Sequence, residues 1–233
     1  MTRRGWGRGK GALASLGLAA IFALSCGLED TKAISAPSTF VYLSGGISLG
    51  GASASDTDFI GYRLYYRLFD KDSAASTLYR EIYTLANSET QSPDVIKPIL
   101  IGPKGMKEVQ FTDSVSQTML PISAADKAAA AATFTISTSV LPWTITKNGG
   151  ATTLSSAVQR SAKDIGSGNY KDFTASTVLQ GDEDYTGTID NPSSVYAVFC
   201  ILSVATSDGI SEYYSMPTLL SGTSESYLVI LGD

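Results

Sequence analysis

The segment that most constrains the fold is the apolar run at residues 195–206. Successive side chains of a strand point to opposite faces of a sheet, and here both alternating sets are apolar. A strand with two apolar faces is typical of a sheet that is covered on both sides. One face carries Tyr196, Val198, Cys200, Leu202 and Val204, and the other carries Val195, Ala197, Phe199 and Ile201.

A second strand is predicted at residues 59–69, where apolar and basic residues alternate. This alternation is typical of a sheet with one side in a core. Arg63 and Arg67 fall on one face, and the other face carries Ile60, Tyr62, Leu64, Tyr66 and Leu68.

The period of the pattern changes to that of a helix at residues 73–87. Asp72 or Ser73 is available as its cap and Asn87 as its stop. This helix is the natural cover for the outer face of the strand at 195–206. A second, short helix is predicted at residues 124–132, where Ser123 and Asp126 resemble a capping box. The apolar side of the first helix consists of Leu78, Tyr79, Ile82, Tyr83 and Leu85.

The remaining apolar segments predict short strands. The strongest signal is a hairpin, in which Asn148 and Gly149 connect residues 143–146 to residues 152–159. Polar, glycine-bearing segments at 162–174 and 180–191 are interpreted mostly as loops. The sequence therefore predicts a mainly β fold of sandwich-like antiparallel sheets with one or two inserted helices, after a cleaved N-terminal signal helix. Further strands are predicted at 40–43, 47–49, 109–113, 132–139, 210–216 and 227–231.

Two of these segments resemble strands of fibronectin type III or immunoglobulin-like sandwiches. Ile60-x-Gly-Tyr-x-Leu-Tyr-Tyr is similar to the third strand of a type III module. The run from Tyr196 to Ala205, followed by Asp208-Gly209 and another strand, is similar to its last hairpin. The chain departs from such a module between them, where it has about 125 residues instead of a few tens.

The N-terminus has the features of a secretory signal. Residues 3–10 hold four basic residues and no acid, and a small-to-apolar run at 11–24 leads to Ala23-Leu24-Ser25-Cys26. The run is too short for a stable membrane span. The last four residues resemble a bacterial lipobox, which implies cleavage before Cys26 and attachment of diacylglycerol to its thiol. Two alternatives remain: an ordinary signal peptide in which Cys26 is incidental, and a loose twin-arginine signal at residues 2–6.

The predicted organisation is a signal peptide at residues 1–25, a lipidated tether at 26–39 and a β-rich domain at 40–233 with a helical insertion around 73–132. Together, the signal, the strand motif and the late sheet are similar to uncharacterised lipoproteins of spirochaetes. This likeness implies a location in the bacterial cell envelope, at the periplasmic face or the cell surface, with palmitate or related acyl chains as the anchor.

Charge restricts the partners. Without residues 1–25 the chain has 13 basic and 22 acidic residues, a formal charge of about −9. Nucleic acid is not expected as a partner, because phosphate contacts need clustered Lys and Arg. The expected partners are the membrane, through the lipid, and an unidentified protein or other ligand of the envelope or the host.

The chain contains no histidine, so the usual general base of a catalytic triad is absent. Gly46-Ile47-Ser48-Leu49-Gly50 spells a nucleophile elbow, but Ser48 has no histidine to serve as its base and no following helix. No cofactor is expected, since no phosphate-binding glycine motif precedes a helix. No metal site is expected either: Asp182, Glu183, Asp184 and Asp190 could bind calcium, but a solvated acidic turn is preferred.

The expected function is that of a membrane-anchored, non-catalytic binding or structural module. A small-ligand carrier is the alternative, and an envelope hydrolase using Ser48 is less favoured. Cys200 is interpreted as a small buried hydrophobe without a disulfide partner. Tyr65, Tyr213 and Tyr214 are candidates for an exposed recognition surface, although cross-strand packing explains them equally well.

Overall fold

The computed structural model describes residues 34–51, 58–112, 116–124, 126, 133–149, 155–163, 170–206, 209–223 and 227–232. Residues 33–233 form one compact unit with its own apolar core. The predicted signal helix and Cys26 lie outside the described residues.

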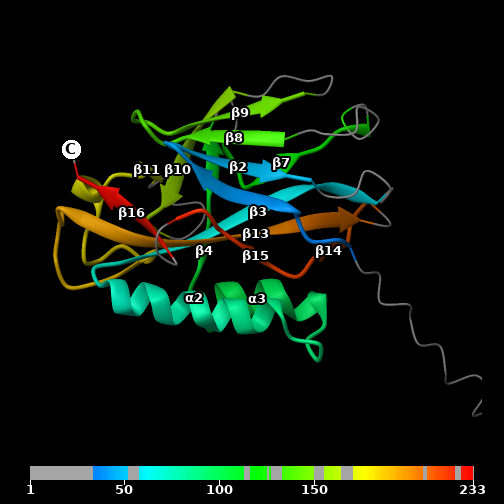
Figure 1. Cartoon of the computed structure of the whole chain (residues 1–233), viewed down its shortest axis with the longest axis horizontal. Helices are drawn as coiled ribbons and strands as arrows, with labels where there is room; N and C mark the ends of the chain where they lie inside the picture. The colour runs from blue at the N-terminus through cyan, green and yellow to red at the C-terminus, as the bar shows by residue number, and fades with distance from the viewer. Residues whose placement is uncertain are drawn as a thin grey trace, which may run out of the picture. The chain divides into compact units, whose positions relative to one another are not determined.

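Two β-sheets and a layer of helices are stacked in this unit (Figure 1). Pairing within the sheets is antiparallel except between β12 and β3, which confirms the predicted mainly β, sandwich-like fold. Sheet A has the order β1 (Thr39–Leu43), β2 (Gly46–Gly50), β8 (Thr133–Ser137), β9 (Thr144–Asn148), β10 (Ser155–Ser161), β5 (Gln110–Thr112) and β6 (Ser116–Gln117), with β11 (Tyr170–Asp172) also on β10.

Sheet B is built around two long strands, β3 (Phe59–Phe69) and β13 (Ser194–Thr206). They pair along almost their whole length, from Tyr196 opposite Phe69 to Ala205 opposite Phe59. Short strands extend the sheet on either side. On β3 these are β12 (Tyr185–Thr186), β4 (Lys107–Glu108) and β7 (Met119–Pro121), and on β13 they are β14 (Glu212–Tyr214), β15 (Thr218–Leu219) and β16 (Leu228–Leu231).

The two apolar faces predicted for β13 are confirmed. Val195, Ala197, Phe199 and Ile201 belong to the core between the sheets, which also contains most inward residues of sheet A. The opposite set belongs to a second core beneath the helices. Its fully buried members on β13 are Val198, Cys200, Leu202 and Val204.

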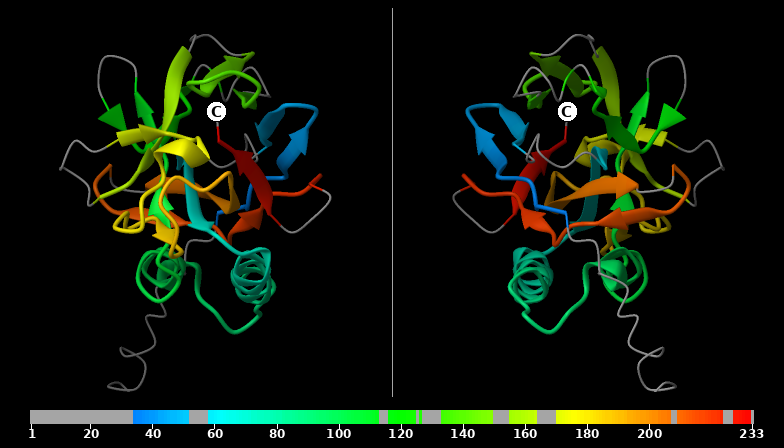
Figure 2. Two further views of the ribbon diagram at one scale, coloured as in Figure 1. Left: turned by 90° about the vertical axis from the view of Figure 1, so that its left-hand side faces the viewer. Right: turned by 90° about the vertical axis from the view of Figure 1, so that its right-hand side faces the viewer.

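The predicted helix over the second core is α2 (Asp72–Ala86), and it ends at Asn87 as expected. The predicted cap is wrong, because Asp72 and Ser73 lie inside the helix and Lys71 occupies the N-cap position without a side-chain hydrogen bond. Tyr83 is exposed, so its predicted place on the apolar face is wrong; Ala75 is buried on that face. Beside α2 lies a helix that the sequence analysis did not predict, α3 (Ile96–Ile101), preceded by η1 (Pro93–Val95). Figure 2 shows both helices beneath sheet B. The buried residues of the two helices are Ala75, Leu78, Ile82, Leu85, Ile96 and Leu100.

One predicted face position is wrong because β3 contains a bulge. The register skips Ile60, since Val204 lies opposite Gly61 and Ala205 lies opposite Phe59. The extra residue turns Phe59 into the core between the sheets and Ile60 toward the helices. Glycine is needed at position 61, because a Cβ there would lie 2.2 Å from the Leu120 carbonyl oxygen.

Most other predicted strands are present, including the hairpin of β9 and β10, in which Ser155 lies opposite Thr146. The segments interpreted mostly as loops each contain a short strand, β11 in the first and β12 in the second, and η2 (Ala175–Thr177) lies between the two segments. Ser123 and Asp126 exchange the hydrogen bonds of a capping box, but most of the predicted helix at 124–132 lies outside the described residues. In the predicted tether, Ile34 is buried in the core.

Candidate functional site

Ser48 lies in the middle of β2, between Val41 of β1 and Thr135 of β8. Both neighbours are strands of sheet A, and the next described element after β2 is another strand, β3. The Gly-x-Ser-x-Gly spelling is therefore part of a regular strand and has none of the geometry of a nucleophile elbow.

The acidic segment is not the solvated turn that was predicted. Asp182 and Asp184 are buried, whereas Glu183 between them is exposed and forms an ion pair with Lys107. The prediction failed because the sequence pattern does not show which residue pairs with these aspartates. Arg160 on β10 is fully buried and forms ion pairs with both carboxylates. Within the described ranges, no three His, Cys, Asp or Glu side chains are grouped closely enough to hold a metal ion.

We call Arg160, Lys171, Asp182, Asp184 and Tyr66 the Arg160 cluster. Nη1 of Arg160 donates to both carboxylate oxygens of Asp184 at 2.7 and 2.9 Å, and Nη2 donates to Asp182 at 2.5 Å. Lys171 donates to Asp182 at 3.0 Å, and the Tyr66 hydroxyl donates to Asp184 at 2.6 Å. Two cations face two carboxylates, so the cluster is neutral as a whole. It joins sheet A, sheet B and the loop that carries the two aspartates.

The pKa values within the cluster respond to burial and to hydrogen bonding. Burial would raise the pKa of Asp182, but hydrogen bonds from Arg160, the Leu179 N–H and Lys171 outweigh it and hold this pKa below its ordinary value. Burial raises the pKa of Asp184 despite the charge of Arg160. Each charged group has a partner within the cluster, which is the arrangement that makes buried charge tolerable.

A second cluster lies on the helix side of sheet B. Arg63 forms ion pairs with Glu108 at 3.3 Å and Glu212 at 2.8 Å, and Lys97 of α3 approaches Glu108 at 3.6 Å. Tyr65 donates to Glu108 at 3.0 Å. This set, the Arg63 cluster, again balances two cations against two carboxylates and connects α3 to the sheet.

Of the two alternatives for Tyr65, Tyr213 and Tyr214, the structure contradicts the exposed recognition surface and favours packing. Tyr65 and Tyr214 are buried in the second core, and Tyr213 is partly buried against the first. Burial and the charge of Glu108 raise the pKa of Tyr65. Lys97 donates to the Tyr214 hydroxyl at 2.8 Å, and Tyr214 donates to Glu212. Position on a strand alone did not show that helices would cover these rings.

Cys200 is a buried free thiol in the second core, as predicted. Its Sγ contacts the sulfur of Met106 at 3.7 Å. Burial raises the pKa of the thiol, so the reactive thiolate is suppressed.

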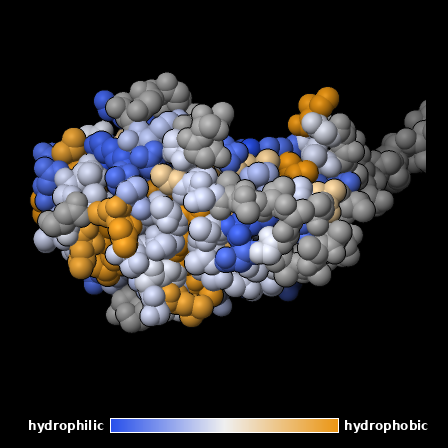
Figure 3. All heavy atoms as spheres, turned by 90° about the horizontal axis from the view of Figure 1, so that it is seen from above, coloured by the Kyte–Doolittle hydropathy of each residue, from blue (hydrophilic) through white to orange (hydrophobic). Residues whose placement is uncertain are grey.

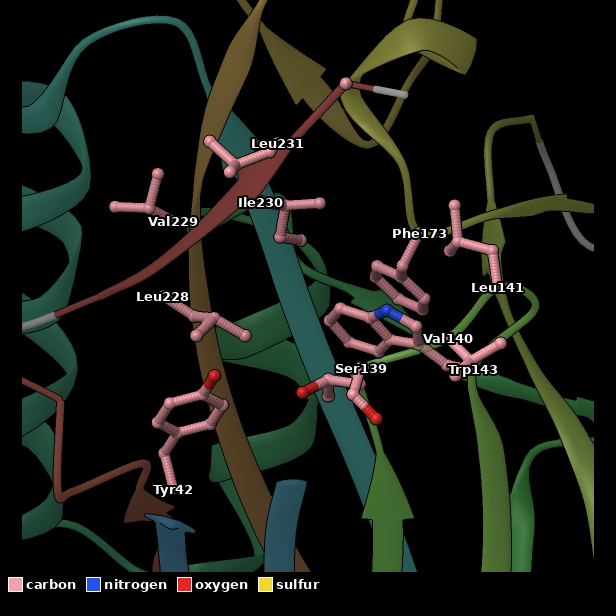
Figure 4. A pocket seen from close by; sticks show the side chains of 12 residues that line it. Tyr42, Ser139, Val140, Leu141, Trp143, Phe173, Leu228, Val229, Ile230 and Leu231 are labelled. Atoms are coloured by element: carbon pink, nitrogen blue, oxygen red, sulfur yellow. The ribbon is translucent and has the colours of Figure 1, made fainter. Parts of the chain in front are cut away.

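An open groove lies at one edge of the sandwich, where the end of β1 and the loop from β8 to β9 face β16 (Figure 4). Its volume is about 290 Å³. None of its lining residues, all of them described, carries a charge. We call it the Trp143 groove; it is lined by Tyr42, Thr138, Ser139, Val140, Leu141, Trp143, Phe173, Leu228, Val229, Ile230, Leu231 and Gly232.

The base of the Trp143 groove is aromatic and almost wholly buried. The Trp143 ring stacks on Phe173 with centroids 4.8 Å apart and an interplanar angle of 14°. In Figure 4, Ile230 points from β16 toward these rings. Tyr42 and Ser139 lie at one end of the groove, where they place hydroxyl groups. A ligand in the groove would therefore contact an aromatic floor and find hydroxyl groups at one end.

The rim exposes large apolar side chains. Val140 is 69% exposed beside the groove, and Leu231 (67%) and Val229 (45%) are exposed on the face of β16 that points away from Trp143 (Figure 4). Figure 3 shows apolar residues gathered toward the end of the molecule where Figure 1 places β16, among mostly polar surface. Grouped apolar exposure of this kind marks interaction sites. This site was not predicted from the sequence, although Val140 and Leu141, two large apolar residues before Pro142, were a signal for it.

No helix in the described part of the chain has the length and apolar character to cross a membrane. Comparison with protein-family models, curated proteins and solved structures finds no match for this chain.

Proposed function

We propose that this chain is a lipid-anchored lipoprotein of the bacterial envelope, whose β-sandwich binds an apolar ligand in the Trp143 groove without catalysis. The observation that carries the binding proposal is the groove itself: an open, uncharged cavity with an aromatic floor and exposed apolar rim residues. Ligand sites have this composition, and the volume lies near the lower end of their range.

The ionisable residues support binding over catalysis. In the Arg160 and Arg63 clusters the charged groups are paired with one another and connect elements of the fold. Ser48 lies in a regular strand of sheet A. None of these groups lines the Trp143 groove.

The binding proposal is tested by the fluorescence of Trp143. Trp6 precedes the proposed cleavage site, so a chain of residues 27–233 contains Trp143 as its single tryptophan. This chain includes the whole compact unit of residues 33–233. Decanol, an uncharged apolar probe, is expected to shift the emission of Trp143 saturably. A chain whose emission does not respond to decanol contradicts the proposal.

Two variants show where the probe binds. Val140→Gln changes a rim side chain that is mostly exposed, and we expect it to weaken decanol binding several-fold by removing apolar contact. Ile101→Gln changes a partly exposed apolar residue of α3, which does not line the groove, and is expected to leave binding unchanged. Equal effects of the two variants would indicate non-specific association.

The anchor is tested separately in cells. Incorporation of labelled palmitate is expected in the wild-type chain and is expected to be lost in Cys26→Ala. Protease treatment of intact and opened cells then distinguishes the cell surface from the periplasmic face. Labelling that persists in Cys26→Ala contradicts the lipid anchor and leaves the groove proposal to its own test.

A further inference from the structure

The outer edge of β16 carries backbone groups that point away from its partner strand. Gly232 N–H donates to the Ser193 carbonyl at 2.9 Å, which makes this a hydrogen-bonded pair of the antiparallel ladder. Such pairs alternate, so Ile230 is bonded to Val195 and the backbone of Val229 faces the other way. Among the described strands, β16 pairs with β13 alone. The N–H and C=O of Val229 therefore lie on an edge to which no described strand is added.

The open part of this edge is short, because the Thr174 hydroxyl donates to the outward-facing Leu231 carbonyl at 3.4 Å and leaves Val229 as the uncovered position. Natural proteins cover such edges or place charges or proline on them, because an open edge recruits another strand. β16 reads Leu-Val-Ile-Leu and has neither charge nor proline. Its inward side chains, Leu228 and Ile230, line the Trp143 groove, and the outward ones are exposed. An apolar open edge beside an apolar groove is suited to strand addition.

We propose that the occupant of the Trp143 groove is an extended, apolar segment of a partner protein, which pairs with the outer edge of β16 at Val229. This inference rests on the proposed function and specifies its ligand. The segment inserts side chains between Trp143 and Ile230, while its backbone exchanges hydrogen bonds with Val229.

Two physical arguments favour a peptide strand over a small amphiphile. A purely apolar ligand over this edge would cover the N–H and C=O of Val229 without replacing their bonds to water, which lowers affinity. A strand satisfies both groups. Charge defines the segment further: the groove is uncharged, while the chain from Cys26 onward carries a formal charge of about −9. The inserted part is thus uncharged, and basic flanking residues would speed its association.

The test uses capped synthetic peptides of alternating Val and Thr, with Trp143 fluorescence of the 27–233 chain as the readout. One analogue carries N-methyl groups on the amides of one edge, and a matched analogue carries them on the other edge. We expect one of the two analogues to lose about fivefold in affinity, since it loses the hydrogen bond from a peptide N–H to the Val229 carbonyl, and the other to bind like the parent. Equal binding of parent and both analogues overturns the inference.

Substitutions at Val229 provide a second, independent test of strand pairing. Val229→Pro removes the N–H of the outer edge without touching the bond to β13, whereas Val229→Ala removes only the side chain beyond Cβ. The proline variant is expected to lose more peptide affinity than the alanine variant, while both bind decanol alike. If the proline variant fails a thermal-unfolding check, the N-methylated peptides alone decide the question.

The remaining outcomes separate the two proposals. Binding of decanol but of no peptide overturns the strand inference and leaves the proposed function standing. Failure of both probes contradicts both proposals. A dimer of the free chain that dissociates in Val229→Pro would identify a second copy of the chain as the occupant, and this too overturns the inference.

Discussion

The Arg160 cluster and the Trp143 groove both depend on contacts between the two sheets, but they differ in chemistry. In the cluster, two cations and two carboxylates meet in the interior, and Arg160 is fully buried. In the groove, the lining residues carry no charge and the rim is exposed. The cluster connects the two sheets in the interior of the sandwich, whereas the groove is accessible at one of its edges.

This difference indicates which part of the molecule is available for partners. Charged side chains most often suggest function when they lie in a cleft with perturbed pKa values. Here the perturbed groups of the Arg160 cluster satisfy one another and connect three elements of the fold. The available surface is apolar instead, so we expect substitutions in the two regions to have opposite profiles: loss of stability in the cluster and loss of binding in the groove.

The largest expected effect is that of Arg160→Met. Removing the cation leaves Asp182 and Asp184 buried without their main partner, and breaking a buried ion pair in this way costs about 3–5 kcal/mol of unfolding free energy. Urea unfolding of the 27–233 chain measures it. Lys107→Met, which breaks the more exposed pair with Glu183, is the control and should cost about 1 kcal/mol or less. Similar losses in both variants would contradict a special role for the cluster.

A smaller loss is expected for Tyr66→Phe. The hydroxyl donates to Asp184 and accepts from the Ser161 N–H at 2.5 Å, so its removal leaves two buried groups each without one partner. The expected cost is about 1–3 kcal/mol in the same urea assay. Tyr79→Phe, on the partly exposed side of α2, should change stability by no more than about 0.5 kcal/mol. If the two variants unfold alike, the hydroxyl of Tyr66 contributes little to closing the sandwich.

The cluster shows what the sequence could and could not predict. Arg160 lies just beyond the strand predicted at residues 152–159, among polar residues, and nothing in that pattern indicates that it turns inward. Its burial depends on Asp182 and Asp184, which are more than twenty residues away in a segment interpreted as a loop. Periodicity reports which faces are apolar, and it predicted both faces of β13 correctly. It does not report how distant polar residues pair.

The same limit applies to the groove. Trp143 and the residues of β16 were assigned to strands, but the edge between them depends on how two sheets meet. The bulge at Ile60 is a further case, because one inserted residue reverses a face without changing the alternation of residue types. α2 was predictable because its apolar stripe lies within one continuous segment.

A third prediction concerns pH and sharpens the assignment of Asp182 to the cluster. Its folded pKa lies below the unfolded value of about 3.9, so its contribution is complete above that value and is lost as the pH falls through the folded pKa. Asp184 acts in the opposite direction, because its pKa is raised. We therefore expect the stability difference between wild type and Asp182→Asn to shrink as the pH falls below about 4. A constant difference would contradict this; Glu89→Gln, at an exposed position, controls for the substitution itself.

The smallest effect on stability is expected in the groove. Val140→Gln changes a lining side chain that is mostly exposed, so the unfolding free energy should shift by about 0.5 kcal/mol or less. Binding of decanol should nevertheless weaken, because the rim loses apolar area. A variant that loses stability while its binding is unchanged would reverse the proposed difference between groove and cluster.

The central position of β13 also has a consequence for the order of folding. β13 occupies residues 194–206, and its main partner β3 occupies residues 59–69, so the defining contact of sheet B joins segments more than a hundred residues apart. Contacts of such long range form slowly. Neither core can be completed before the last quarter of the chain has emerged from the ribosome. Under the proposed export across a membrane, this arrangement would keep both cores incomplete until most of the chain has been made.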